Sequence, residues 1–129
     1  MSAKTQRIIG WVLSGIISAF LIVASGVPKL IGQVPEDMLK TLGFTSDTIW
    51  RIGIVEVIVA LLFIIPQTGF LGAILVTGYL GGAICTHVRI GDLNFIMPIV
   101  MGILTWVALG LRQPEIFRLA IGKRVATPV

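Results

Sequence analysis

The feature that most constrains this chain is a series of four apolar stretches, each close to the length of a membrane-spanning helix. An α-helix rises about 1.5 Å per residue, so roughly 20 apolar residues cross the hydrocarbon core of a bilayer, which is about 30 Å thick. We place the spans at residues 8–27, 48–65, 70–88 and 94–111. The sequence therefore predicts one all-α domain over residues 1–129, an integral membrane four-helix bundle.

Composition indicates that lipid is the solvent for much of this chain. Charged residues make up 12% of it, and the mean hydropathy is +1.01. A soluble domain carries about 25% charged residues. The one cysteine, Cys85, excludes an intrachain disulfide and a self-contained dithiol redox pair. A structural zinc site takes about four ligands, so the one histidine gives no basis for a metal site, and none is predicted.

Two shorter amphipathic segments accompany the spans. Pro35, two acidic residues and a closing Gly43 are the start and stop signals of a short helix between the first two spans. Pro114 opens a second stretch, in which apolar and charged side chains fall on opposite helical faces. We expect both segments to lie in the membrane interface.

The distribution of positive charge predicts the orientation in the membrane. An even number of spans places both termini on one side, and six Lys and Arg residues lie near the chain ends: Lys4, Arg7, Arg112, Arg118, Lys123 and Arg124. The positive-inside rule then predicts cytoplasmic termini in the inner (plasma) membrane. The net charge of +4 fits anionic lipid, so the lipid bilayer is a predicted partner and nucleic acid is not.

Small residues predict where the helices pack. In the third span they recur every fourth position at Gly69, Ala73, Thr77, Gly81 and Cys85, and in the first span at Gly10, Ser14 and Ser18. Lipid offers no hydrophobic drive between helices, so packing depends on such close backbone approaches. The third span is thus expected to be central, and two alternatives stay open: these stripes face the bundle interior, or they face a second copy in a homo-oligomer.

Glu56 is the most informative residue, because it lies deep inside the second predicted span. A carboxylate there is costly and usually faces a partner or a wet cavity. The predicted topology places the other strongly polar residues near the spans on the same, outer side: Lys29, His87, Arg89, Asp92 and Asn94. This one-sided clustering predicts an outer polar pocket.

The residues of this cluster admit two interpretations. In the functional one, Glu56 and His87 are catalytic proton-transfer groups, because histidine titrates near neutral pH and burial raises the pKa of a carboxyl towards it. Lys29, Arg89 and Asn94 would then bind an anion or an oxygen of a substrate. In the structural one, Glu56 forms an ion pair with Lys29, Arg51 or Arg89. Asp92 then caps a helix, and the cations anchor to lipid headgroups.

Three segments carry a resemblance to a known family: Ser25 to Leu30, Gly53 to Val57, and Thr77 to Arg89, in which small residues precede Thr-His-x-Arg. They resemble the motifs of DoxX-like proteins, which are small four-helix bacterial membrane proteins. The resemblance implies that Lys29, Glu56, His87 and Arg89 correspond to the family's polar residues. It also implies association with membrane redox complexes and oxidative-stress defence. The family is named after a subunit of an archaeal thiosulfate:quinone oxidoreductase, whose catalytic assignment is not carried over to this chain with its single cysteine.

Three functions compete at this point. The first is a redox-associated membrane protein or small membrane enzyme, with a redox partner protein, that binds a small or lipid-like, quinone-type molecule in the outer pocket. The second is a non-enzymatic membrane subunit or assembly scaffold. The third, a transporter, ranks last, because one bundle of four spans would need a dimer for alternating access. The cofactor is left open, with a quinone and a haem bound by His87 as the candidates.

Overall fold

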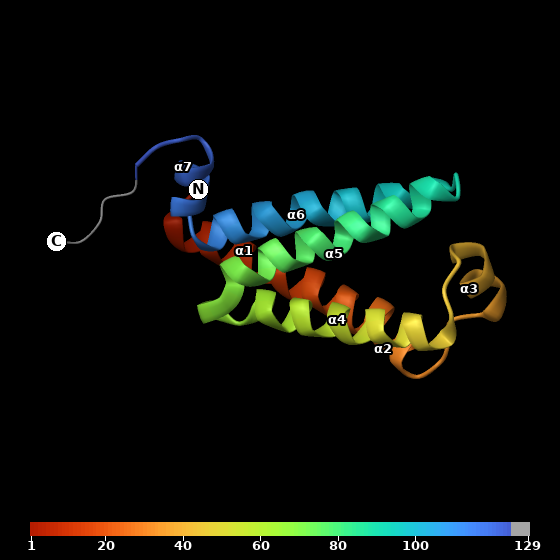
Figure 1. The fold of residues 1–129 in the computed structure, drawn as a ribbon. Coiled ribbons are helices and arrows are strands. Elements are labelled where there is room, and N and C mark those ends of the chain that lie inside the picture. The colour runs from red at the N-terminus through yellow and green to blue at the C-terminus, as the bar shows by residue number, and fades with distance from the viewer. Residues whose placement is uncertain (125–129) are drawn as a thin grey trace.

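A computed structural model of the chain describes residues 1–124. All secondary-structure elements in this range are helices, and it contains no β-strand (Figure 1). The elements follow one another as α1 (Ala3–Ala19), η1 (Phe20–Gly26), α2 (Val27–Leu30), α3 (Glu36–Leu42), α4 (Ser46–Ile64), η2 (Pro66–Thr68), α5 (Gly69–Arg89), η3 (Leu93–Phe95), α6 (Ile96–Arg112) and α7 (Glu115–Ala120). The predicted all-α class is confirmed.

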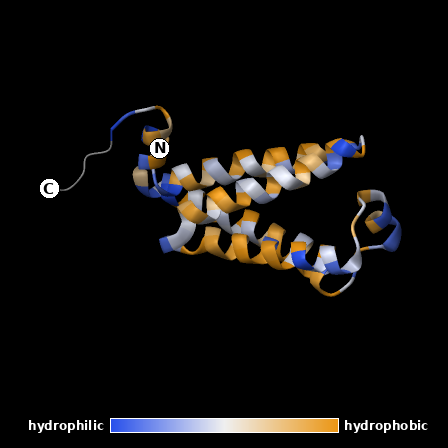
Figure 2. Cartoon of the chain, viewed as in Figure 1, coloured by the Kyte–Doolittle hydropathy of each residue, from blue (hydrophilic) through white to orange (hydrophobic). Residues whose placement is uncertain are grey.

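Three helical stretches are long and apolar enough to cross a membrane: Ala3–Leu30, Pro66–Arg89 and Leu93–Arg112. They contain the first, third and fourth predicted spans. Helix α4, which contains most of the second, is 19 residues long and carries three charged residues, Asp47, Arg51 and Glu56. The chain is therefore a membrane protein with several apolar helices, and its hydrophobic residues run along the long helices while hydrophilic ones gather at α3 and at helix ends (Figure 2).

The first span is longer than predicted, because helix continues from Ala3 to Leu30 through the π-helix η1. Pro28 has no N–H to donate, and its ring crowds the preceding turn of a regular α-helix. Wider turns precede it, and the Val27 N–H donates to the Ile22 carbonyl five residues back. A π-helix is rare and is frequently found at functional sites. This element was not predicted from the sequence.

The two predicted short helices are present. Helix α3 follows Pro35 and ends at Gly43, whose positive φ of 80° suits glycine. Helix α7 follows Pro114. Their location in the membrane interface stays a prediction.

The long helices run back and forth and contact one another in a ring, with α1 against α4 and α6, and α5 against α4 and α6. Both described chain ends and the η2 turn lie at one end of the molecule, which we call the closed end (Figure 1). Helix α3 and η3 lie at the other, which we call the open end. Helix α5 has its main contacts with two long helices and is not central, contrary to the sequence-based expectation.

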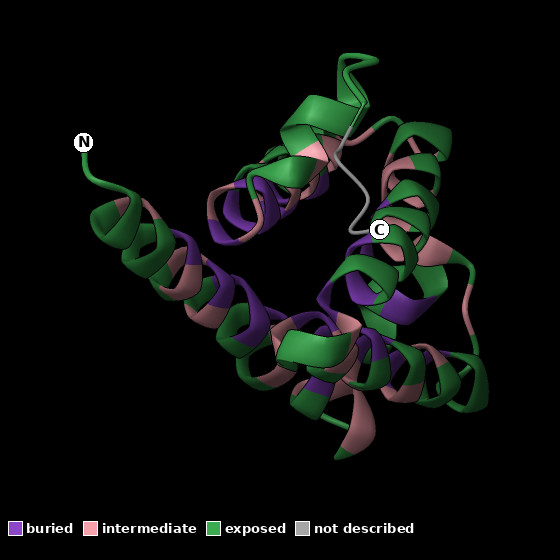
Figure 3. Ribbon diagram, turned by 90° about the vertical axis from the view of Figure 1, so that its left-hand side faces the viewer, coloured by how far each residue is buried: buried purple, intermediate pink, exposed green. Residues whose placement is uncertain are grey.

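Backbones pack directly against each other at the closed end. A Cβ on Gly72 of α5 would collide with the backbone of Phe63 in α4, and one on Gly10 of α1 would lie 2.8 Å from the backbone nitrogen of Arg112 in α6. Ser14 and Ser18 are buried, as the small-residue stripe of the first span predicts. Figure 3 shows the buried residues on the helix sides that face other helices.

The open end is packed differently. Among the residues that the structure describes, a Cβ placed on Gly78, Gly81 or Gly82 would have no atom within 4 Å beyond the adjoining turns of α5 itself. Of the two alternatives for the α5 stripe, packing inside the bundle holds for Gly69 and Ala73, which are buried, whereas Gly81 and Cys85 in its outer half are exposed. The helices diverge towards this end, and the space between them is a pocket.

Candidate functional site

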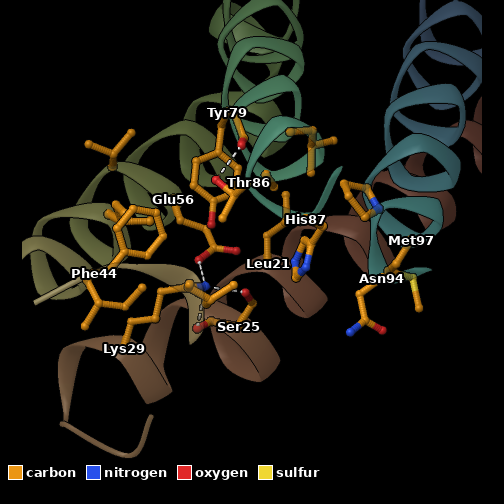
Figure 4. Close-up of a pocket in the computed structure, with 18 of the residues that line it drawn as sticks. Leu21, Ser25, Lys29, Phe44, Glu56, Tyr79, Thr86, His87, Asn94 and Met97 are labelled. Carbon is orange, nitrogen blue, oxygen red and sulfur yellow. Dashed lines mark hydrogen bonds and ion pairs between the residues drawn. The ribbon is translucent and has the colours of Figure 1, made fainter. Parts of the chain in front are cut away.

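The pocket at the open end has a volume of about 870 Å³ and is lined by η1, α2, α4, α5, η3 and α6 (Figure 4). Residues 38, 42 and 44, in and just after α3, also line it. Most lining side chains are apolar, and the polar or charged ones are Ser25, Lys29, Thr48, Arg51, Glu56, Tyr79, Thr86, His87 and Asn94. Four of the five residues predicted for the site are thus brought together around one cavity.

Lys29 and Glu56 form an ion pair at the inner wall of this pocket. Lys29 Nζ lies 2.6 Å from Glu56 Oε2, and the side chains are 16% and 1% exposed. Nζ also donates to Ser25 Oγ at 2.7 Å and to the Ser25 carbonyl at 3.2 Å. An ammonium group has three N–H donors, so each one has a protein acceptor here. The structural alternative for Glu56, a pair with Lys29, is the arrangement observed.

Two glycines allow this pair to form. A Cβ on Gly53 of α4 would lie 2.8 Å from Lys29 Cβ, and one on Gly26 of η1 would lie 2.8 Å from Val57 Cγ2. Because neither residue has a side chain, η1 and α2 lie close to α4. Lys29, near the end of the first helix, is thereby held at the depth of Glu56.

Tyr79 is a member of the site that sequence reasoning missed. Its hydroxyl points towards the Glu56 carboxylate, and Ser25 is its other polar neighbour (Figure 4). The available signal was a phenol inside an apolar span, where a hydroxyl needs a partner.

His87 lines the pocket, but it pairs with Asp92 rather than with Glu56. His87 Nδ1 lies 3.0 Å from Asp92 Oδ2, and Asp92 Oδ1 accepts a hydrogen bond from the Asn94 N–H at 2.6 Å, which caps η3. The predicted cap is confirmed. The hydrogen bond with His87 is the main cause that lowers the pKa of Asp92. With the Nδ1 proton directed at Asp92, Nε2 of a neutral His87 is left as an acceptor.

Arg89 and Asn94 are placed differently from each other. Asn94 lines the pocket, whereas Arg89 does not. Instead, Arg89 Nη2 donates to the Leu42 carbonyl at 2.7 Å, at the last residue of α3, where helix carbonyls have no partner within the helix. This hydrogen bond connects the end of α5 to the end of α3 beside the pocket.

Arg112 is the residue whose environment departs furthest from expectation. The sequence placed it among the cations outside the apolar segments, but it is buried, 4% exposed, at the closed end. Nη1 donates to the Phe63 carbonyl at 2.9 Å and to Ser14 Oγ at 3.2 Å, and the guanidinium lies 3.9 Å from the centre of the Trp11 ring. Nε and Nη2 have no hydrogen-bond partner within residues 1–124, nor does a carboxylate there form an ion pair with it.

Residues 1–124 contain no group of three or more His, Cys, Asp and Glu side chains that could hold a metal ion. Cys85 is a free, exposed thiol. The polar groups of the site are the Lys29–Glu56 pair, His87 with its partner Asp92, Arg51, Asn94 and several hydroxyl groups.

The chain was compared with protein families, curated proteins and solved structures. Residues 12–108 match the DoxX-like family, a range that contains all five predicted site residues and the Lys29–Glu56 and His87–Asp92 pairs. No curated protein and no solved structure matches the chain. The family match covers most of the chain and includes the motifs that carry the resemblance, so the chain belongs to the DoxX-like family.

Proposed function

We propose that this protein spans the membrane four times and binds a small lipid-like molecule in the open-end pocket. The observation that carries the proposal is a cavity of about 870 Å³ with mainly apolar walls and a smaller number of polar groups. Ligand pockets commonly have volumes of about 300–1,000 Å³ and this kind of lining.

The ion pair supports α4 as a membrane span, in addition to the three long apolar stretches. Glu56 is neutralised by Lys29, so the deepest charge of α4 enters the membrane as a neutral, hydrogen-bonded pair. The other two charges of α4, Asp47 and Arg51, form an exposed pair in its first turns at 3.0 Å, where they reach the headgroups. The three charges therefore do not prevent α4 from crossing the bilayer.

The cations that remain at the closed end support the proposed orientation. With Arg112 buried, Lys4, Arg7, Arg118, Lys123 and Arg124 still favour a cytoplasmic closed end and an open end facing outward from the plasma membrane. A Lys40→Cys substitution, made in a Cys85→Ser background, tests this. We expect an impermeant thiol reagent to label it in intact cells; labelling only after lysis would reverse the orientation.

A redox role is the form of this function that family membership favours. In this proposal a quinone-type molecule occupies the pocket, Glu56 and His87 exchange protons with its head, and Asn94 contributes a further polar contact. A redox partner protein would supply or remove the electrons. Asp92 supports the assignment of His87, because a second partner that fixes the ring orientation is what a general base requires.

A non-enzymatic scaffold is the alternative that a specific observation favours. All three donors of Lys29 are paired within the protein, which is what a purely structural ion pair would need. In that case the exposed glycines of α5 would serve contacts with a second copy or another subunit.

Mass spectrometry of the protein purified in mild detergent separates the two proposals. If the pocket is functional, a lipid-like molecule accompanies the wild type and is lost in Glu56→Gln and His87→Ala. If both variants keep the bound molecule and any activity but have a lower melting temperature, the scaffold proposal is correct.

A further inference from the structure

Resting on the proposed pocket function, we infer that its ligand is an uncharged amphiphile with a hydroxyl head, which donates a hydrogen bond to the Glu56 carboxylate. Paired cations and unfilled acceptors beside Glu56, together with apolar walls, support it. It replaces the sequence-based expectation that Lys29 and Arg89 bind an anion or an oxygen of the substrate.

Within residues 1–124, no Lys or Arg side chain near the pocket is free to bind an anion at its inner wall. The Lys29 ammonium has its three acceptors on Ser25 and Glu56. Arg51 lies at the rim, is 74% exposed and pairs with Asp47 at 3.0 Å, while Arg89 is bonded to α3 outside the pocket lining. An anionic head would have to enter apolar surroundings against the Glu56 carboxylate without a new counter-ion, which is strongly unfavourable.

Acceptors, by contrast, are available. An ionised carboxylate has about four lone-pair sites, and the Lys29 bond and the neighbouring Tyr79 hydroxyl leave some of them for a donor in the pocket. His87 Nε2 is a second acceptor when the Nδ1 proton is directed at Asp92. A ligand head that binds these two acceptors has to donate, and a hydroxyl group is the uncharged donor that a membrane-dissolved molecule commonly carries.

The remaining walls suit a hydrocarbon tail. Phe20 and Leu21 of η1 face the cavity from one side, and Met97 and Met101 of α6 from another. Methionine side chains adapt to irregular apolar shapes, so the walls can accept a branched tail. An isoprenoid alcohol and a quinol share the required chemistry of a hydroxyl head on an apolar body.

Three compounds with one tail test the head group: farnesol, farnesyl methyl ether and farnesyl monophosphate. We would measure their affinities for the full-length protein in lipid nanodiscs by the rise in melting temperature on titration. Farnesol should bind about ten- to a hundredfold more tightly than the ether, which cannot donate, because hydrogen bonds to charged groups contribute about 1.5–3 kcal/mol. The phosphate should bind more weakly than farnesol.

The outcomes distinguish this inference from the pocket function itself. Tightest binding of the phosphate, or equal affinity for all three compounds, would leave the pocket proposal intact and overturn the hydroxyl-donor inference. Failure of all three to bind, together with failure of a benzoquinol that has a ten-carbon tail, would count against the pocket as a binding site. Tighter binding of that benzoquinol than of farnesol would identify a quinol, and the reverse order an isoprenoid alcohol.

A charge-neutral double variant tests Glu56 without leaving Lys29 unpaired. In Lys29→Met/Glu56→Gln both charges are removed together, so the fold does not retain a lone buried cation. We expect farnesol affinity to fall about tenfold in this variant, with the affinity for the ether unchanged. Equal loss for both compounds would mean that the pair only shapes the pocket, and the inference would be wrong.

Discussion

The two ends of the molecule each hold a cation away from water, and they do so in different ways. At the closed end, Arg112 is met by a carbonyl, a hydroxyl and an aromatic face. At the open end, Lys29 is met by the Glu56 carboxylate. Phe63 is the residue before the last of α4, so Arg112 binds a carbonyl without a helical partner and lies at the negative end of that helix. Arg112 therefore connects helices, whereas Lys29 pairs with a buried carboxylate beside a cavity.

The packing of α5 differs between the same two ends. Gly72 is in direct contact with the α4 backbone, while Gly78, less than two turns further along, has open space beside it. One helix thus supplies a sealed contact at one end and a pocket wall at the other. The comparison teaches that small residues in a membrane helix mark either close packing or a cavity, and the pattern alone does not distinguish them.

The largest effect is expected from breaking the open-end pair on one side. Glu56→Leu leaves the Lys29 ammonium without its carboxylate, and removal of one partner of a buried pair costs about 3–5 kcal/mol. Adding Lys29→Met should recover most of that loss, because no unpaired charge remains. Reversible unfolding in detergent measures both variants. A double variant as unstable as the single one would show that the ion pair is not the reason for the loss.

The glycines of α5 provide the next test. Gly72→Ala forces a methyl group into the Phe63 backbone and should destabilise the protein by about 1–3 kcal/mol or more. Gly78→Ala, in the same helix, should be neutral or stabilising by up to about 1 kcal/mol, since alanine is the better helix former. Similar melting temperatures for the two variants would contradict the difference in packing between the ends.

Removal of the Arg112 side chain should destabilise the protein less than removal of the Glu56 carboxylate. Arg112→Met removes a buried charge together with its desolvation cost, so the net loss should be about 1 kcal/mol, mainly from the lost contact with Trp11. Arg112→Lys should be less stable than Arg112→Met, because lysine keeps the charge but lacks the planar fork that reaches Phe63 and Ser14. The reverse order in an unfolding experiment would make the charge itself the stabilising feature.

The smallest effect concerns Asp92 and pH. Its hydrogen bond with His87 lowers the pKa of Asp92 in the folded state, so this bond contributes to stability above the unfolded pKa of about 4. The contribution is lost as pH falls through the lower folded pKa. We expect the melting-temperature difference between the wild type and Asp92→Asn to be present at about pH 5 and to shrink below about pH 4. A difference that grows on acidification would exclude this bond as its source.

Much of the fold was accessible from sequence, because hydropathy, prolines and glycines act locally. They predicted the all-α class, three of the spans and both short helices. The π-helix was not predicted, because a proline such as Pro28 in a sequence is usually taken to end a helix. In the structure the helix continues past it through the wider turns of η1. The burial of Arg112 was missed because the sequence does not show which way an arginine at the end of an apolar span points. Such a residue is usually interpreted as an anchor in the membrane interface.

The sequence placed several polar residues of the pocket on one side of the bundle, but it did not determine how they pair. Lys29, Glu56, His87 and Asn94 line one pocket, as the one-sided clustering implied. Which carboxylate meets which cation depends on how Gly26 and Gly53 let two helices approach, and on where η3 turns the chain. Those are tertiary effects, so the His87–Asp92 pair and the position of Arg89 on α3 emerged only from the structure.

The central claim is that the unpacked half of α5 faces a cavity that holds a lipid-like molecule. Native mass spectrometry of the protein released from mild detergent tests it with one pair of variants, Gly78→Leu and Gly81→Leu. Both glycines have open space beside them, but only Gly78 lines the pocket at the open end. The account predicts that the wild type and Gly81→Leu carry an added small-molecule mass and that Gly78→Leu does not. An added mass on all three proteins, or its loss from Gly81→Leu alone, would contradict it.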